Sequence, residues 1–455
     1  VFYVLPFQAS INAMHGRLSE ALKHTGADVR LLHASSRVLP ASNGRAALDF
    51  TEKALQDKVG AAVKVLTPHQ LAGIAFGTRG YETLLLDVQG TYTSVSQAIV
   101  LKLVEILSQQ GCRLHIGTAT MPSVLYEHVA ALLGREQVHE VRLTDAELDT
   151  YDRHTVHKEA GADVDTWLPI IKQAVQKGEK VLLVFNRVKH AQDAFDVVCE
   201  ELRDVRSMLL HSRFKRGRRA ELEQQLLQEF NPADKPGPCI VVSTQVVEVS
   251  LDISFDRMIT EAAPLDALVQ RFGRINRRRT LSTRGQLRPV HVLAPPDTDK
   301  DAKPYELLTV QASYAVLPHA AVLRERDVQR LIDQVYPTVD FTDVHANSIF
   351  RDGQWQQHLL THRSRSYLLG LLEIDSVACV LEQDAEAYRA ACQRRDLEEQ
   401  TRLEIPLSFK PHSLRQMKQL DCGHRPYRVP DNAYTDDTGL RAEKIRLESG
   451  QFYEL

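Results

Sequence analysis

The chain has 455 residues, of which 43% are hydrophobic and 25% charged, and its formal net charge is −3. This length is too great for a single core and predicts about three domains, while the charge excludes a globally basic protein, so any nucleic-acid surface must be a local groove. The apolar runs are too short to span a membrane, and the cysteines form no CxxC pair, as in reduced cytoplasmic proteins.

Up to about residue 300, short apolar runs alternate with longer helical patterns. This alternation is typical of βαβ units that form a parallel sheet covered on both faces. Buried strands are predicted at residues 2–5, 62–66, 83–86, 113–116, 181–185, 208–210, 239–242, 258–260 and 290–293. Helices are predicted at residues 99–107, 167–176, 189–202, 218–230 and 264–272. Gly111 and Gly178 suit the position that follows a helix.

Two polar stretches divide this pattern. A connection that contains histidines lies near residues 150–163, and a proline-rich stretch occupies residues 294–304. We therefore expect α/β domains over residues 1–150 and 151–298 and a smaller accessory domain over residues 299–455. In the last of these, only a helix near residues 321–335 is predicted.

Residues 241–279 carry the most specific functional pattern of the chain. Ser243-Thr244-Gln245 follows an apolar strand, and Gln270-Arg271-Phe272-Gly273-Arg274-Ile275-Asn276-Arg277 comes near the end of the segment. Arginine forks bind phosphate oxygens in pairs, and an arginine supplied to a phosphoryl-transfer site stabilises charge in the transition state. The pattern therefore indicates one side of an ATP cleft, in preference to a basic surface helix.

The motifs resemble, in order and wording, those of the type I CRISPR-associated helicase, a superfamily-2 motor that works with the Cascade complex. The resemblance rests on motif-like stretches at residues 3–7 and 11–12, 66–71, 117–122, 184–188, 211–214 and 244–256, and on Tyr434 with Gly439-Leu440. It implies two tandem RecA-like parallel-sheet domains followed by a C-terminal accessory domain. It also implies ATP and magnesium as cofactors, single-stranded DNA as substrate, and Cascade with its R-loop as partner.

The same resemblance implies roles for individual residues. The catalytic positions are Asp87, Arg274, Arg277 and Gln270, and Asp87 would also hold magnesium through water. ATP contacts fall on Asp252, Gly273 and Arg271, and the coupling of ATP to movement falls on Thr118 and Thr120. Nucleic-acid contacts fall on Pro6, Thr67, Gln70, Asn186, Arg187, Ser212, Arg213, Thr244 and Gln245, which suit phosphate contacts without base readout.

The sequence departs from this family in three places. It has no GxxxxGK[ST] phosphate loop, which we expect in a segment before Val1. At the DExH-box position, Asp87 keeps its carboxylate, but Val88 replaces the glutamate and Gly90 the histidine; valine cannot activate water. An engineered substitution, a natural loss and a different register all remain open. No His-Asp dipeptide occurs, so an HD nuclease is expected outside this chain.

Several alternatives remain open. The chain could be a catalytically silent, helicase-like module that binds DNA or Cascade, which Val88 favours and the arginines disfavour. A repair or RNA helicase of the same superfamily is disfavoured by the wording of residues 3–7 and 244–256. The basic run at residues 213–219 could line a nucleic-acid channel or form a solvated loop. The histidines at 154 and 157 and the Cys422-Gly423-His424 stretch are more typical of structural residues than of metal ligands.

Overall fold

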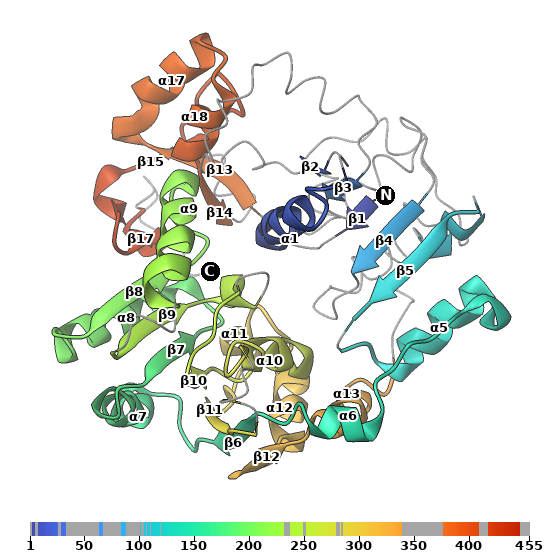
Figure 1. Ribbon diagram of the computed structural model, residues 1–455. Coiled ribbons are helices and arrows are strands. Elements are labelled where there is room, and N and C mark those ends of the chain that lie inside the picture. The colour runs from blue at the N-terminus through green and yellow to red at the C-terminus, as the bar shows by residue number, and fades with distance from the viewer. Residues whose placement is uncertain are drawn as a thin grey trace.

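The computed structural model describes residues 2–4, 8–25, 29–32, 63–66, 83–87, 101, 104–105, 107–109, 111–118, 120–231, 237–248, 252–278, 283, 285–338, 376–408 and 417–445. These residues form two sheets made mostly of parallel strands and a smaller C-terminal part (Figure 1). The predicted α/β class is therefore confirmed. Within the described ranges, the helices fall short of the length and apolar character that crossing a membrane requires.

The first sheet has five strands in the order β2-β3-β1-β4-β5, and all its pairs are parallel. The strands are β1 (Phe2–Val4), β2 (Val29–Leu32), β3 (Val63–Leu66), β4 (Thr83–Asp87) and β5 (Arg113–Gly117). Of these only β2 was not predicted. The described helices of the first 150 residues are α1 (Gln8–Ala21), which packs on β2 and β3, α5 (Ser123–Leu133), and α6 (Asp145–Asp149), which contacts residues 325–327. We call the sheet with α1 and α5 the first body.

The helix predicted at residues 99–107 is confirmed where the structure describes it. Leu101, Val104 and Leu107 are helical and buried. Gly111 follows with a φ of 72°, a left-handed conformation that glycine adopts without steric cost. The amide of Cys112 donates to the carbonyl of Leu107 at 2.9 Å, which closes the helix end.

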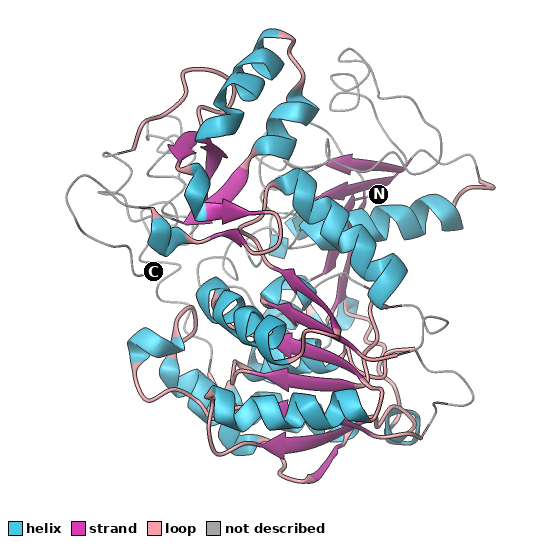
Figure 2. Ribbon diagram, turned by 90° about the vertical axis from the view of Figure 1, so that its left-hand side faces the viewer, coloured by secondary structure: helices cyan, strands magenta, loops and turns pink. Residues whose placement is uncertain are grey.

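The second sheet has seven strands in the order β12-β6-β11-β10-β7-β9-β8, parallel except for β12. The strands are β6 (His154–Lys158), β7 (Lys180–Val184), β8 (Arg206–Leu210), β9 (Cys239–Ser243), β10 (Arg257–Thr260), β11 (Arg288–Val292) and β12 (Ala321–Leu323). The helices that accompany it are α7 (Val164–Gln176), α8 (Val188–Glu201), α9 (Arg216–Gln225) and α10 (Leu265–Phe272). Figure 2 shows helices packed against the strands of this sheet. We call this part, together with α11 (Asp299–Ala302), α12 (Leu307–Val316) and α13 (Val328–Val335), the second body.

Strands β7, β9 and β10 are buried along their whole length. Continuous apolar runs suit parallel strands that are covered on both faces, which is why these strands could be predicted. The sheet brings the ends of β7, β9 and β10 to one edge, where open α/β sheets bind ligands. The residues that follow these strands are therefore placed near one another.

Two expectations for the second body were wrong. The polar connection predicted near residues 150–163 contains β6, in which His154 and Val156 are buried and the His154 Nε2 lies 3.2 Å from the Ile275 carbonyl oxygen. The helix predicted near residues 321–335 is divided into β12 and α13 (Val328–Val335). In both places tertiary pairing outweighed local pattern.

The second body also continues past residue 298, where the sequence placed the domain end. It includes α11 (Asp299–Ala302) and α12 (Leu307–Val316) as well as α13. Val310, Leu331 and Ile332 are buried in the same core as β7 and β9. Apolar burial therefore joins residues 299–335 to the second sheet.

The C-terminal part contains a three-stranded sheet in the order β14-β13-β15. Its elements are β13 (Ser376–Leu381), α17 (Ala385–Gln393), α18 (Leu397–Leu403), β14 (Ile405–Ser408), β15 (Tyr427–Val429), and the pair β16 (Tyr434–Thr435) and β17 (Gly439–Leu440). Cys379, Leu381 and Ile405 are buried in its own core. Helix α18 packs against α9 of the second body (Figure 1).

Candidate functional site

The loop that carries Arg274 and Arg277 is fixed to the start of β10. The amide of Phe255 donates to the carbonyl of Arg274 at 3.0 Å, and the amide of Asn276 donates back to Phe255 at 3.1 Å. Asn276 has a φ of 49°, and asparagine tolerates this left-handed region better than most residues do. Helix α10 thus ends in a turn with defined geometry.

Arg271 is completely buried and is used by the protein itself. Its Nε donates to Glu248 at 2.8 Å, one Nη donates to the Thr260 hydroxyl at 2.8 Å, and the other donates to Asn186 Oδ1 at 2.9 Å. Burial is the largest single effect and lowers the pKa of this guanidinium, but Glu248, Tyr305 and Glu261 together outweigh burial and raise the pKa above its ordinary value. Arg271 is therefore bonded as a structural cation within the second body, and its expected contact with ATP stays a prediction.

Arg274 and Arg277 differ from Arg271 because their positive charge is poorly compensated. Arg274 donates to the Glu248 backbone carbonyl. Burial, with the charge of Arg277 beside it, lowers the pKa of Arg274 to about 9. Arg277 is 31% exposed, and its Nε forms an ion pair with Asp252 Oδ1 at 3.0 Å. A site that depresses the pKa of arginine favours the arrival of an anion.

Arg277 also lies near the first body. Burial lowers the pKa of Arg277, and among the charges that lower it further is Arg17 of α1. Arg153, which comes just before β6, acts on the pKa values of both Arg274 and Arg277 in the same direction. Cations from both bodies therefore lie near one place, which suits the phosphates of a nucleotide.

Gln270 and Gly273 complete the motif on α10. The Oε1 of Gln270 is buried and lacks a hydrogen-bond partner among the residues that the structure describes, which leaves it available to a ligand. Gly273 closes the helix by donating its amide to Val269 at 3.0 Å. A Cβ at position 273 would lie 3.1 Å from the Gln270 carbonyl oxygen, so close packing accounts for this glycine.

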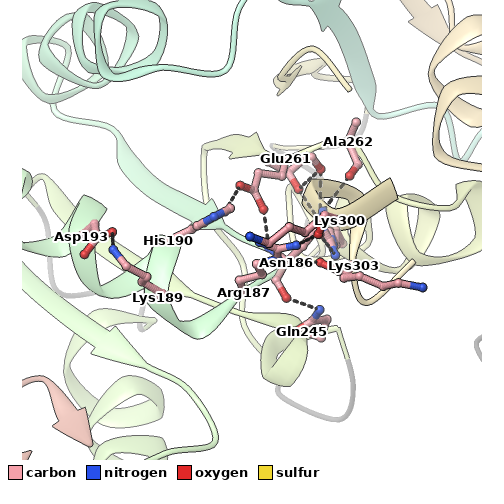
Figure 3. A network of polar contacts seen from close by, with 12 residues as sticks. Asn186, Arg187, Lys189, His190, Asp193, Gln245, Glu261, Ala262, Lys300 and Lys303 are labelled. Carbon is pink, nitrogen blue, oxygen red and sulfur yellow. Dashed lines mark hydrogen bonds and ion pairs between the residues drawn. The ribbon is translucent and has the colours of Figure 1, made fainter. Parts of the chain in front are cut away.

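Asn186 and Gln245 belong to a polar network at the ends of β7 and β9 (Figure 3). Asn186 donates its amide to Glu261 at 2.6 Å and its side-chain amide to the Ala262 carbonyl at 2.8 Å. Gln245 donates to the Asn186 carbonyl at 2.8 Å. These side-chain donors bind the protein itself, and the nucleic-acid contacts expected at these residues stay predictions.

Arg187 also differs from expectation. Its guanidinium donates to the carbonyl of Lys303 at 3.0 Å and to that of Lys300. Both carbonyls belong to the segment that contains α11, so this arginine fixes that segment against the end of β7 (Figure 3). Thr244 lies directly after β9. It is buried, and its amide donates to the Leu210 carbonyl at 3.3 Å.

The basic run at residues 213–219 contacts the C-terminal part. The Arg213 carbonyl accepts from the Leu440 amide at 2.8 Å, Lys215 forms an ion pair with Asp384 at 2.6 Å, and the Arg216 amide donates to the Glu404 carbonyl at 2.9 Å. The charges of this run therefore support a contact within the chain, beyond the two alternatives left open by the sequence. Ser212, in the same loop, is half-buried.

His211 also contacts the C-terminal part. It is buried, stacks on Phe214 with ring centroids 4.5 Å apart, and its Nε2 donates to the Thr438 carbonyl at 3.0 Å. Its Nδ1 accepts from the Arg213 amide at 3.1 Å, which fixes a neutral tautomer. Burial lowers the pKa of His211 to about 3, so the ring stays uncharged at neutral pH.

In the first body, Asp87 is the last residue of β4, and the described facts concern its backbone only. Thr118 follows β5, and its hydroxyl accepts from the amide of Thr120, a buried residue, at 3.3 Å. Pro6, Thr67 and Gln70 lie outside the described residues. Within the described residues, no group of three or more His, Cys, Asp or Glu side chains could hold a metal ion.

Sequence reasoning missed some residues that build this site. Glu248, which the sequence indicated only as a structural or cleft-lining residue, anchors both Arg271 and Arg274. Arg17 gave no signal, because its place near Arg277 depends on how the two bodies meet. Asp333 contacts the loop of Thr118 and Thr120 from the second body, although the sequence predicted only that it lies on a helix.

Comparisons with known proteins agree with this arrangement. A family model for the C-terminal part of the CRISPR-associated nuclease/helicase Cas3 matches residues 177–280. The Cas3 of Methanothermobacter thermautotrophicus is 26% identical over 302 residues, which are 61% of this chain and 35% of that relative. The Cas3 of Streptococcus thermophilus is 38% identical over 111 residues, 24% of this chain and 12% of that relative. The chain thus spans only about a third or less of the length of these relatives.

Solved structures share the fold. The crystal structure of T. fusca Cas3 with ATP matches 96% of this chain and 63% of that chain, with a TM-score of 0.65 and 20% identity. A chain of a pre-nicking CRISPR RNA-guided surveillance complex matches 97% of this chain and 67% of that chain, with a TM-score of 0.59 and 17% identity. The RecA-like architecture expected from the sequence is therefore confirmed. The motifs, the two parallel sheets and these matches together make the chain similar to the helicase region of the type I CRISPR-associated Cas3 family.

Proposed function

We propose that the chain is the motor part of an ATP-dependent helicase that moves on single-stranded DNA and unwinds target DNA at the R-loop of a Cascade-type complex. The observation that carries the proposal is the placement of Arg274 and Arg277, whose pKa values are lowered, with Arg277 near Arg17 of the first body. The proposed place of action is the cytoplasm. An HD nuclease outside this chain is the proposed partner for cleavage.

The chemistry follows from the charges. Arg277 is exposed enough to exchange its contact with Asp252 for phosphate oxygens, while Arg274 is held in place by Glu248. A bound anion would offset the burial and the repulsion from neighbouring arginines that lower both pKa values. Arginines fixed before the reaction stabilise transition-state charge without reorganisation. Closure of the two bodies on ATP is then favoured by the same contacts.

Magnesium would be held by Asp87 through water, as the family resemblance implies. A carboxylate at the end of β4, on the ligand-binding edge of the sheet, fits the preference of magnesium for oxygen ligands. The ion would neutralise phosphate charge. Gln270, whose buried Oε1 lacks a partner among the residues that the structure describes, would face the nucleotide from the second body.

Fewer residues are proposed to contact DNA than the sequence predicted. Ser212 and Thr244 remain proposed contacts in the second body, together with Pro6, Thr67 and Gln70 in the first. Thr118 and Thr120 remain the proposed coupling residues. Hydroxyl and amide contacts to phosphate suit a motor that must step along any sequence. Asn186, Arg187 and Gln245 instead support the protein around this surface.

A second candidate function rests on Val88. With valine at the water-activating position, the chain would bind nucleotide and DNA without turnover. A helicase-like binding module of this kind would keep the arginines as a clamp on bound nucleotide. The two functions differ in one measurable quantity, the rate of ATP hydrolysis.

The test is the ATP hydrolysis rate of the full-length gene product with and without single-stranded DNA. The motor predicts turnover that DNA stimulates. Turnover that is absent in the wild type and is established by Val88→Glu would contradict the motor and support the binding module. If neither protein hydrolyses ATP, both the motor and the explanation by Val88 are wrong.

A further inference from the structure

Helix α13 (Val328–Val335) touches both bodies, and no motif assigns it a role. Its apolar side, Val328, Leu331 and Ile332, is buried in the core of the second body, where α13 packs on α10 and α12. Its polar residues Gln329 and Asp333, one helical turn apart, contact the first body. Figure 1 shows α13 between α5 and α10.

The contact with the first body is made to the backbone beside the coupling loop. Asp333 accepts from the Ser123 amide and from the Ser123 hydroxyl, both at 2.8 Å. Gln329 donates to the Met121 carbonyl at 3.0 Å and to Asp333 Oδ1 at 3.1 Å. Met121 and Ser123 come shortly after Thr120, so a shift of residues 117–122 relative to α13 would change the three distances that join α13 to the first body.

Helix α5 needs this contact because it lacks a cap of its own. It begins at Ser123 after Pro122, whose side chain has no acceptor. The first amides of a helix have no partner within the helix, and a carboxylate is favoured there by hydrogen bonding and by the helix dipole. Asp333 therefore supplies from the second body the acceptor that a neighbouring residue usually supplies.

The other end of α13 is fixed to the arginine helix. Tyr336, which follows α13, donates its hydroxyl to Asp266 Oδ1 at 2.6 Å. Asp266 is 2% exposed and lies in the first turn of α10. Since α10 leads into the loop of Arg274 and Arg277, the same short helix connects residues 117–122 with both arginines.

We propose that α13 mechanically couples the ATP site to residues 117–122. Asp333 and Gln329 bind the first body, and Tyr336 binds α10. The proposal rests on the ATP-driven function proposed above and adds the residues that couple hydrolysis to movement. Asp333 touches neither nucleotide nor DNA and is a positioning residue. Without the contact that Asp333 makes, ATP is still hydrolysed, but fewer base pairs are unwound per ATP.

The test compares Asp333→Ala with the control Asp327→Ala in the full-length gene product. Asp327 lies at the start of the same helix, and its ion pair with Arg330 is exposed. Asp333→Ala is expected to speed hydrogen exchange of the amides at residues 123–126 by about fivefold. It is also expected to raise the ATP consumed per base pair unwound by about fivefold or more, with little change in the hydrolysis rate. Asp327→Ala should leave both quantities unchanged.

Ser123→Ala removes the partner hydroxyl and provides an independent check. The double variant Ser123→Ala/Asp333→Ala should consume no more ATP per base pair than Asp333→Ala alone, because the two residues act through one contact. Exchange at residues 123–126 that is unchanged in Asp333→Ala would overturn the contact. An unchanged consumption of ATP per base pair would overturn the coupling. A wild-type protein without ATP hydrolysis would instead reject the proposed function, while the exchange measurement still decides whether Asp333 caps α5.

Discussion

Arg271 and Arg277 belong to one short motif, yet their environments assign them different roles. Arg271 is completely buried and bonded to Glu248, Thr260 and Asn186. Arg277 is partly exposed and paired with Asp252. The family resemblance implied a catalytic role for Arg277 and an ATP contact for Arg271. The sequence could not predict that Arg271 is buried and bonded within the protein, because its partners come from other elements.

Arg271→Met is expected to destabilise the fold by about 3–5 kcal/mol, since it leaves the buried Glu248 carboxylate without its cation. The exposed Arg278→Ala serves as control and should change stability by no more than about 0.5 kcal/mol. The urea unfolding midpoint measures both. If Arg271→Met kept the wild-type midpoint and only weakened nucleotide binding, the structural role of Arg271 would be rejected.

The buried His211 predicts a specific pH dependence. Folding lowers its pKa, chiefly by burial, to about 3, so the unfolded chain binds a proton that the folded chain excludes. Its contribution is complete above about pH 6.5 and declines as the pH falls, by about 1.4 kcal/mol per unit, down to the folded pKa. The positive charges of Arg213, Arg219 and Arg441 act in the same direction.

His211→Gln keeps a donor and an acceptor but does not titrate. The thermal midpoint of the wild type should therefore fall more steeply between pH 6.5 and 5 than that of His211→Gln. Other titrating groups contribute equally to both proteins. Parallel curves would show that His211 is not excluded from protonation in the folded state.

At the scale of elements, most strands of the two sheets could be predicted because their sequences are continuous apolar runs. Strand β6 was missed because its alternation contains His154 and His157, which read as polar although His154 is buried. Strand β12 was missed because it is short and exists through antiparallel pairing with β6. Such pairing depends on residues distant in sequence and leaves no local pattern.

The loop between β16 and β17 docks on the β8–α9 loop through Gly439. This glycine has a φ of 66°, and a Cβ there would lie 2.6 Å from the His211 ring and 2.8 Å from the Arg213 carbonyl oxygen. Gly439→Ala should therefore release the C-terminal segment. The expected result is faster proteolysis and faster hydrogen exchange at residues 430–445.

Gly178→Ala is the matched control for this substitution. Gly178 has a φ of 75°, but a Cβ there meets nothing within 4 Å. Gly178→Ala should lower the free energy of unfolding only by the strain of a left-handed residue, about 1–2 kcal/mol. It should not release the C-terminal segment. Equal effects of the two substitutions would show that the contact with His211 does not hold that segment.

At the scale of the whole molecule, three contacts organise the chain. Helix α18 and the segment after β15 attach the C-terminal part to α9, α13 attaches the second body to α5, and the arginine loop faces α1. The sequence predicted two α/β units and a further domain, but not where they meet. Those contacts use single polar residues, such as Asp333, that carry no periodic signal.

The central claim is that Arg277 acts on nucleotide phosphate from the second body. The most direct test is the DNA-stimulated ATP hydrolysis rate of the full-length gene product with Arg277→Ala, compared with the neighbouring exposed Arg278→Ala. We predict that Arg277→Ala lowers the rate by about 10³-fold or more, whereas Arg278→Ala stays within about threefold of the wild type. Equal rates in the two variants would contradict the account.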